Sequence, residues 1–218
     1  MNKKIFQKHN NKIEFKNINF SYNKENVLNN INLRLEQGKI NTITGKNGSG
    51  KTTLINLILG IWDNYCGDIL INDINIKEIK RSILLENIAF CFQSTPVFRD
   101  SVKKNIILDE ELDDCYLNEL LKEMGFYEDI QEMEKGIDTI IGGRDNISGG
   151  QNQKLGLIRT LYTKKSILVF DEPTSSLDKK SQKMFLDKVK SIKENHLVVI
   201  ISHSLNIIQS SDFLFEIN

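Results

Sequence analysis

The sequence predicts an α/β fold with a mainly parallel sheet, an antiparallel β part near the N-terminus and an inserted helical subdomain. The main evidence is three short, almost wholly apolar runs at residues 88–92, 167–170 and 197–201. Runs of this length without alternation are typical of parallel strands that are covered on both faces. A more polar run at residues 40–44 stands in the same kind of context, so we expect four parallel strands.

The first seventy residues show a different pattern, because apolar and polar residues alternate there as they do in antiparallel strands. The apolar positions are Ile13, Phe15, Ile18, Phe20, Tyr22, Ile31, Leu33, Leu35, Ile69 and Ile71. This alternation predicts a separate antiparallel β part.

Helical patterns account for the rest of the chain. One helix is predicted over residues 52–59, with Gly60 placed to end it, and another over residues 178–193. Between residues 94 and 146 there is no convincing strand, and the clearest element is a helix near residues 113–124. We therefore expect a single domain over residues 1–218. Its core comprises residues 1–93 and 155–218, and residues 94–154 form the helical subdomain.

Composition excludes several classes of protein. The 218 residues carry 29 Lys and Arg against 29 Asp and Glu, a balance that argues against a dedicated nucleic-acid binder. The cysteines Cys66, Cys91 and Cys115 have no metal-ligand spacing, and the simplest interpretation is a reducing compartment. No apolar run approaches the roughly 18 residues that span a bilayer. The N-terminus turns polar too soon for a signal peptide, so we expect a cytoplasmic chain.

The first motif with a chemical meaning follows the run at residues 40–44. Gly45, Lys46, Asn47, Gly48, Ser49, Gly50, Lys51 and Thr52 match the phosphate-binding loop G-x-x-x-x-G-K-[ST]. Glycines let backbone N–H groups turn toward phosphate oxygens, the lysine neutralises phosphate charge, and the threonine hydroxyl can hold Mg²⁺. The alternative is a glycine-rich surface turn, but the predicted strand before the motif and the helix after it favour the phosphate loop.

Two carboxylates, Asp171 and Glu172, end the apolar run at residues 167–170. Beside a phosphate loop, an Asp at the end of a strand is placed to support Mg²⁺, and a Glu one residue later can polarise an attacking water. Taken alone, the pair fits a strand followed by an acidic turn better. The phosphate loop favours the catalytic interpretation.

Ser148, Gly149, Gly150 and Gln151 precede another helical pattern, so a hydroxyl and free N–H groups are expected at a helix N-terminus, which is an anion site. A second phosphate motif so far from the first in sequence is hard to explain within one subunit. Two subunits would explain it.

On these motifs the chain resembles the nucleotide-binding domain of an ABC transporter, from about residue 13 to residue 217. Residues 45–53, including Thr53, resemble Walker A. Residues 167–172 resemble Walker B with its catalytic glutamate, and residues 146–151 resemble the family signature with Ile147 in place of Leu. The resemblance implies a RecA-like P-loop core. It places Gln93 in the Q-loop, Asp178 in the D-loop and His203 in the switch, and it makes Tyr22 the aromatic residue that stacks on adenine.

The strand pattern agrees with this placement. Gly45, Gln93, Asp171 and His203 each follow one of the four expected parallel strands, and ligands of such sheets bind at the carboxyl ends of the strands. Each residue taken alone has a plainer interpretation. Gln93 could be a loop amide, His203 a hydrogen-bonded residue at a strand end, and Tyr22 part of the core.

The resemblance implies an ATPase that binds ATP and Mg²⁺. Glu172, His203, Lys51 and Gln93 would serve hydrolysis, and Thr52, Gln93 and Asp171 would hold the metal. Two copies, as a homodimer or a paired copy, would sandwich ATP between the phosphate loop of one copy and the signature of the other. The chain would drive transport from the cytoplasmic face of the membrane through a transmembrane domain or subunit. The alternatives are a soluble ABC ATPase without a transport role and a nucleotide-binding regulator that does not hydrolyse.

Details of the resemblance favour the exporter-like branch. The matching positions after the Q-loop are Gln93, Pro96, Val97, Phe98, Ser101, Asn105 and Ile106. Three departures accompany it: Gly143 stands where an acidic residue is usual, Lys154 replaces an Arg, and the final strand is expected to be trimmed. The first two put the contact with a membrane partner in question.

Overall fold

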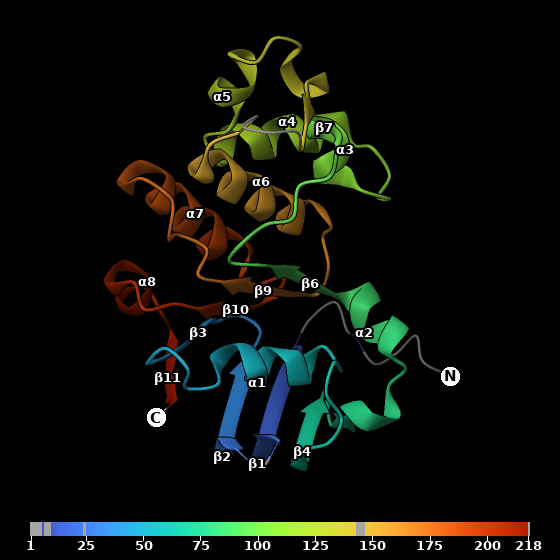
Figure 1. Cartoon of the computed structure of the whole chain (residues 1–218), viewed down its shortest axis with the longest axis vertical. Coiled ribbons are helices and arrows are strands. Elements are labelled where there is room, and N and C mark those ends of the chain that lie inside the picture. The colour runs from blue at the N-terminus through green and yellow to red at the C-terminus, as the bar shows by residue number, and fades with distance from the viewer. Residues whose placement is uncertain (1–5, 7–9, 24, 143–146, 218) are drawn as a thin grey trace. The chain divides into compact units, whose positions relative to one another are not determined.

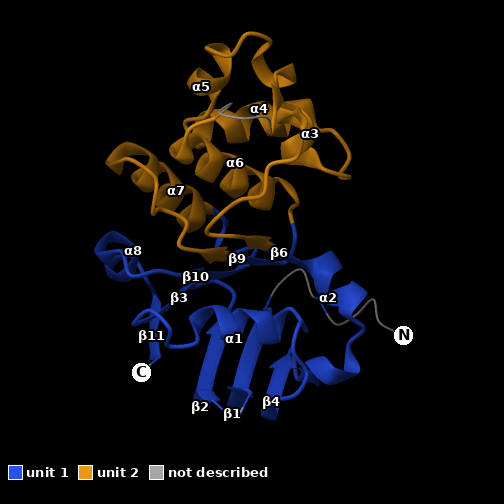
Figure 2. Cartoon of the chain, in the orientation of Figure 1, with its two compact units in different colours: residues 1–89, 165–169, 192–218 blue, residues 90–164, 170–191 orange. Residues whose placement is uncertain are grey.

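A computed structural model describes residues 6, 10–23, 25–142 and 147–217. Contacts between Cα atoms divide the chain into two compact units, shown in different colours in Figure 2. Unit 1 comprises residues 1–89, 165–169 and 192–218, and unit 2 comprises residues 90–164 and 170–191. Unit 2 therefore takes in the whole segment from 94 to 154, and it also includes residues 90–93, 155–164 and 170–191.

Most residues of a five-stranded sheet belong to unit 1, and its strands lie in the order β11-β3-β10-β9-β6. Its strands are β3 (Ile40–Gly45), β6 (Ile88–Cys91), β9 (Ile167–Asp171), β10 (Leu197–Ile201) and β11 (Phe213–Ile217). β3 pairs in parallel with both of its neighbours. The four expected parallel strands thus form β3, β6, β9 and β10. The expected trimming still leaves a final strand of five residues, β11.

The antiparallel part of unit 1 is a four-stranded sheet in the order β2-β1-β4-β5. It comprises β1 (Lys12–Tyr22), β2 (Glu25–Glu36), β4 (Cys66–Ile71) and β5 (Ile74–Asn75). The predicted alternation is confirmed, since Ile13 is fully buried and Phe15 is 2% exposed. The register between β1 and β2 shifts after Phe15, where Asn17 has a φ of 51°. Asn30 on β2 has a similar φ of 49°.

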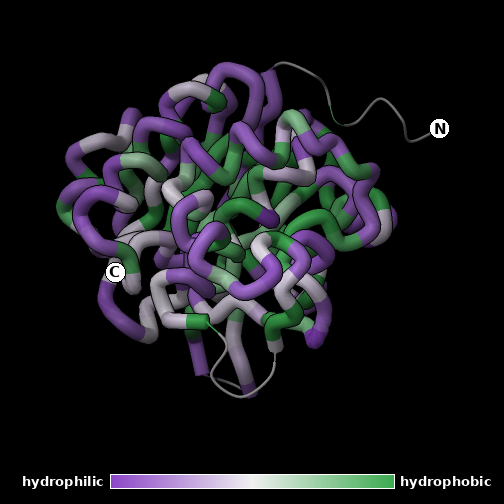
Figure 3. The backbone as a smooth tube through the Cα atoms, turned by 90° about the horizontal axis from the view of Figure 1, so that it is seen from above, coloured by the Kyte–Doolittle hydropathy of each residue, from purple (hydrophilic) through white to green (hydrophobic). Residues whose placement is uncertain are grey.

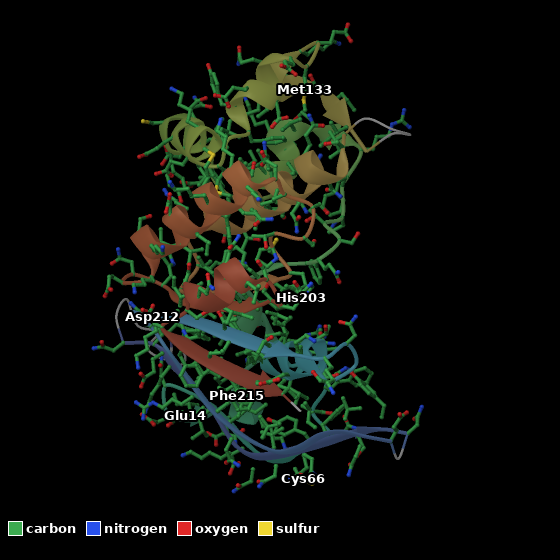
Figure 4. The ribbon with its side chains drawn as sticks, turned by 90° about the vertical axis from the view of Figure 1, so that its left-hand side faces the viewer. Glu14, Cys66, Met133, His203, Asp212 and Phe215 are labelled. Carbon is green, nitrogen blue, oxygen red and sulfur yellow. The ribbon has the colours of Figure 1, made fainter. Side chains whose placement is uncertain are left out.

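The helices of unit 1 are α1 (Lys51–Ile58), η1 (Ile76–Glu78), α2 (Arg81–Asn87) and α8 (Leu205–Gln209). Figure 1 shows α1 continuing from the sheet strand β3 through one loop. At the start of β3, the Asp212 carboxylate accepts hydrogen bonds from the Ile40 backbone N–H and from Lys193, both at 2.8 Å. This contact joins the segment before β11 to β3, and Figure 4 labels Asp212 in that segment and Phe215 on β11.

Unit 2 is mainly helical, as expected. Its helices are α3 (Val102–Ile107), α4 (Asp114–Glu123), α5 (Tyr127–Gln131), η2 (Gly136–Asp138), α6 (Gly149–Tyr162) and most of α7 (Lys179–Ile192). Leu117, Leu120 and Leu155 are at most 1% exposed and belong to its core. The sequence showed no strand between residues 94 and 146, but β7 (Asp100–Ser101) and β8 (Ile140–Ile141) form a two-residue antiparallel pair. A pair this short leaves no periodic signal.

Hydrophobic and hydrophilic stretches follow one another closely along the tube in Figure 3, the pattern of elements with one buried side. In the described part of the chain, no helix is long and apolar enough to cross a membrane. All three cysteines are free; Cys66 and Cys115 are exposed and Cys91 is buried. Burial raises the pKa of the Cys91 thiol to about 12.

Candidate nucleotide site

The loop between β3 and α1 has a backbone that only glycine accommodates at two positions. Gly45 has a φ of 149°, and a Cβ there would lie 2.4 Å from the Ile217 carbonyl oxygen of β11. Gly50 has a φ of 95°, and its Cβ would lie 2.7 Å from Leu28 Cδ2. The motif glycines thus let the loop pack closely against two strands.

The N-terminus of α1 is open. Its N-cap residue is Gly50, and no side chain accepts a hydrogen bond from the first turn. Beside it, Ser49 Oγ is buried and has no hydrogen-bond partner among the described residues. A helix start with free N–H groups and an adjacent unsatisfied hydroxyl is suited to an anion, because both offer hydrogen bonds and the helix dipole adds positive potential.

Lys51 lies over the same loop. Its Nζ atom donates hydrogen bonds to the carbonyl oxygens of Gly45 at 2.7 Å and Lys46 at 2.8 Å. The ammonium group is therefore held at the loop rather than extended into solvent. Thr52 follows in the first turn of α1, and its side chain is exposed.

Tyr22, the expected adenine-stacking residue, is half-buried at the end of β1. Its ring makes edge contacts with Phe20, at a centroid distance of 4.7 Å, and with Trp62 at 5.5 Å. The Thr53 hydroxyl donates to Tyr22 Oη at 3.5 Å. These contacts bring Tyr22 close to the first turn of α1 and leave part of the ring accessible.

His203, labelled in Figure 4, lies two residues beyond β10 and is exposed. Ile201 of β10 pairs with Ile43 of β3 in parallel register. Continuing that register by two residues brings His203 level with Gly45, at the carboxyl edge where the phosphate loop begins. Unit 1 therefore contains the loop, Tyr22 and His203 at one end of its parallel strands.

Asp171 is the last residue of β9 and Glu172 follows it, and both carboxylates are half-buried. Glu172 has a φ of 46°, a left-handed conformation that is uncommon for a residue with a side chain. Its carbonyl oxygen accepts hydrogen bonds from Gln153 Nε2 at 2.7 Å and from the Ser175 backbone N–H at 3.3 Å. Gln153 lies on α6, and no motif in the sequence pointed to it.

Ser148 begins α6 in a capping box. Its Oγ accepts from the Gln151 backbone N–H at 3.2 Å, and the Gln151 side chain accepts from the Ser148 N–H at 2.9 Å. The Asp129 carboxylate of α5 accepts from Gln151 Nε2 at 3.1 Å and from Lys154 Nζ at 2.7 Å. The hydroxyl hydrogen of Ser148 can still donate to a ligand. Gly143 and Asn146 lie outside the described residues.

Two further site candidates belong to unit 2. Gln93 is exposed after β6. Asp178 Oδ1 accepts a hydrogen bond from the Ser181 backbone N–H at 3.0 Å, at the start of α7. Hydrogen bonds from the Ser181 side chain and backbone hold the pKa of Asp178 below its ordinary value.

The residues present fit a nucleotide phosphate and Mg²⁺. The open helix start, the orphaned Ser49 hydroxyl and the Lys51 ammonium are donors for phosphate oxygens. Within unit 1, the Thr52 hydroxyl in the first turn of α1 is an oxygen ligand of the kind that Mg²⁺ prefers. The described residues contain no cluster of three or more His, Cys, Asp or Glu that would hold a metal alone.

A glycine loop between a buried parallel strand and an uncapped helix defines a phosphate-loop nucleotide-binding protein. The family model described as ABC transporter matches residues 28–175 of this chain. The chain belongs to the ABC transporter family.

Relatives and solved structures agree with that assignment. The chain is 36% identical over 211 residues to an export ATP-binding/permease protein of Rickettsia prowazekii, covering 94% of this chain and 37% of the relative. It is 34% identical over 213 residues to an ATP-dependent lipid A-core flippase of Haemophilus influenzae, covering 94% and 36%. A bacterial Atm1-family ABC exporter solved with ATP bound matches with a TM-score of 0.90 and 25% identity, covering 96% and 37%. The chain thus spans little more than a third of the proteins it matches.

Proposed function

We propose that this chain is the ATP-hydrolysing nucleotide-binding domain of an exporter, which powers transport through a transmembrane partner. The observation that carries the proposal is the phosphate loop, where Lys51, the orphaned Ser49 hydroxyl and the open start of α1 converge. The names of the relatives, which include export permeases and a flippase, support the direction of transport.

ATP binding would use groups that the loop already presents. The backbone N–H groups of residues 45–53 would surround the phosphates, with Asn47 and Gly48 at the tip of the loop. Lys51 would leave its loop carbonyls for the β- and γ-phosphates. Tyr22 would stack on adenine with the exposed part of its ring. Thr52, Asp171 and Gln93 would hold Mg²⁺, which supplies neutralisation of phosphate charge when bound.

Hydrolysis would follow from Glu172 acting as the general base. Its carboxylate would take a proton from water as the water oxygen attacks the γ-phosphorus and the bond to the bridging oxygen breaks, giving ADP and phosphate. Lys51 and His203 would stabilise the negative charge that develops on the γ-phosphate. His203 is suited to this role because it lies level with the start of the phosphate loop.

Two copies of the chain would together form each complete ATP site. Ser148, Gly149, Gly150 and Gln151 would contact the γ-phosphate held by the other copy, and Asp178 would lie at the same junction. The surface from Gln93 to Asn105 would meet the transmembrane partner. Phe98 is 53% exposed there, while Arg159 donates to the Pro96 and Asn105 carbonyl oxygens at 2.9 and 2.6 Å and holds the segment in place. The domain would thus work at the cytoplasmic face of the membrane.

The test is the Lys51→Ala variant, compared with Lys39→Ala, which removes the same charge from an exposed ion pair in the same unit. We expect Lys51→Ala to abolish ATP binding or phosphate release with Mg²⁺ while its melting temperature stays near that of the wild type. Lys39→Ala should hydrolyse ATP normally. Unchanged turnover in Lys51→Ala would refute the site. If the wild type binds ATP but does not hydrolyse it, the result would favour the alternative function, a nucleotide-binding regulator that does not hydrolyse.

A further inference from the structure

One buried side chain in unit 2 makes three close hydrogen bonds to a single turn. Gln153 on α6 is 5% exposed. Its Nε2 donates to the Glu172 carbonyl oxygen at 2.7 Å and to Ser175 Oγ at 3.2 Å, and its Oε1 accepts from the Ser176 backbone N–H at 2.6 Å. The carboxamide therefore closes the turn from residue 172 to residue 176 at both ends.

The residue at the first end of this turn has a strained backbone. Glu172 adopts the left-handed conformation, which a residue with a Cβ holds only when its surroundings fix it. Rotation about the N–Cα bond of Glu172, out of the left-handed conformation, would carry its carbonyl oxygen away from Gln153 Nε2 and would redirect the Glu172 side chain at the same time. The bond at 2.7 Å opposes that rotation.

The contact between α6 and the turn extends beyond the carboxamide. A Cβ built on Gly150, in the first turn of α6, would lie 3.2 Å from the Ser176 carbonyl oxygen. The helix that begins at Ser148 therefore touches the turn at two levels, through Gly150 and through Gln153. The direction of the Glu172 side chain is thereby tied to the start of α6.

We propose that Gln153 is a positioning residue that fixes the Glu172 peptide, and through it the direction of the Glu172 carboxylate, for attack by water. The proposal rests on the proposed function, because it requires Glu172 to be the general base. A carboxylate turned away from the water loses most of its effect, since misplacement of a reacting group by about 1 Å can cost roughly 10² in rate.

Two substitutions separate positioning from folding. Gln153→Glu keeps the shape and the acceptor for Ser176 but replaces the donor to Glu172 by an acceptor, and Gln153→Met removes both. Gln182→Met is the matched control, because Gln182 Nε2 donates to the Leu177 carbonyl oxygen at 3.0 Å in the same loop. We expect both Gln153 variants to lower kcat roughly 10- to 100-fold with the Kd for Mg-ATP changed less than about threefold. Gln182→Met should keep kcat within about threefold of the wild type.

A double variant gives the decisive readout. If Gln153 acts through Glu172, adding Gln153→Met to Glu172→Gln lowers the remaining single-turnover rate less than about twofold. An equal loss in both backgrounds would overturn the proposal, and so would equal losses of kcat in Gln153→Met and Gln182→Met. Absence of ATP hydrolysis in the wild type would instead refute the proposed function. If the wild type hydrolyses ATP and Gln153→Glu has the same kcat, the positioning role of Gln153 is refuted and the proposed function is not.

Discussion

The two helices that begin at glycine-rich motifs are constructed differently at their N-termini. α1 starts from a left-handed glycine, and no side chain caps it. α6 starts from Ser148 in a complete capping box, and its first turn is held further by Asp129 of α5. The free N–H groups of α1 need an external partner, whereas α6 is already satisfied in part by its own chain.

This difference indicates two kinds of anion site. The start of α1 can bind phosphate with its own groups, because Lys51 and Ser49 lie beside it. The start of α6 carries one hydroxyl hydrogen and the N–H groups of two glycines, and under the proposed function these groups would contact a phosphate that another copy already holds. The predictions below test this division, from the largest expected effect to the smallest.

Glu172→Gln should give the largest effect, a loss of about 10²–10⁴ in the rate of ATP hydrolysis, because the amide keeps the shape but not the basicity of the carboxylate. With ATP retained between the two kinds of site, the variant should run as a dimer on a sizing column, while the isolated wild-type domain runs mainly as a monomer. Hydrolysis at the wild-type rate would remove Glu172 from the mechanism.

The same dimer tests the role of α6. Adding Ser148→Arg to Glu172→Gln should return the protein to a monomer, because the longer side chain blocks the γ-phosphate of the other copy. The unfolding temperature of the double variant provides the control for misfolding. An ATP-dependent dimer that persists would rule out the head-to-tail sandwich.

Tyr22→Ala should weaken ATP affinity by about 1–3 kcal/mol, the range for stacking between a base and an aromatic ring. Tyr22→Phe keeps the ring and should bind ATP nearly as well as the wild type, as measured by isothermal titration calorimetry. If Tyr22→Ala lowers the melting temperature but not the affinity, Tyr22 serves the cluster with Phe20 and Trp62 and not the nucleotide.

A pair of alanine variants compares the two helix starts directly. Ser148→Ala should lower the free energy of unfolding by about 1 kcal/mol, since it removes the cap of α6. Thr52→Ala, in the exposed first turn of α1, should change that free energy by less than about 0.5 kcal/mol while impairing Mg²⁺-dependent hydrolysis. Urea unfolding measures the free energy of unfolding of each variant, and phosphate release measures its rate of ATP hydrolysis. Equal losses of stability would show that the two termini are not built differently.

A third helix start, that of α7, should give the smallest effect. Hydrogen bonds from Ser181 lower the pKa of Asp178, so its stabilising contribution is present above the unfolded-state pKa of about 3.9. That contribution is lost as the pH falls through the lower pKa of the folded state. Asp178→Asn should therefore flatten the fall in stability below about pH 4, measured by urea unfolding across pH. An unchanged slope would mean that Asp178 does not contribute.

The sequence was most informative where the pattern is long or buried. The run at residues 197–201 predicted β10 because all five residues of that strand are buried. The pattern was weaker in β2, where Asn30 has a positive φ and breaks the alternation, so only residues 31–35 of the longer strand were recognised. β7 and β8 were missed because a two-residue strand has no period.

The residues of the candidate site also differ in how well the sequence predicts them. Residues of the phosphate loop and the signature could be named because their chemistry requires fixed types at fixed spacing. Gln153 and Asp129 could not be named from the sequence. Gln153 donates a hydrogen bond to a backbone carbonyl and Asp129 accepts one from a neighbouring helix, and neither kind of contact requires a fixed spacing along the chain. Their partners are 19 and 22 residues away along the chain, so only folding brings them together.

The three thiols allow one dye to be placed on each of the two units without adding new cysteines. Cys66 is exposed on β4 in unit 1, and Cys115 is exposed on α4 in unit 2. Cys91 is buried with a pKa of about 12, so it contributes almost no thiolate near neutral pH and reacts poorly with maleimides. Donor and acceptor dyes on Cys66 and Cys115 would therefore report, by energy transfer, whether the distance between these two residues changes when ATP and Mg²⁺ are added.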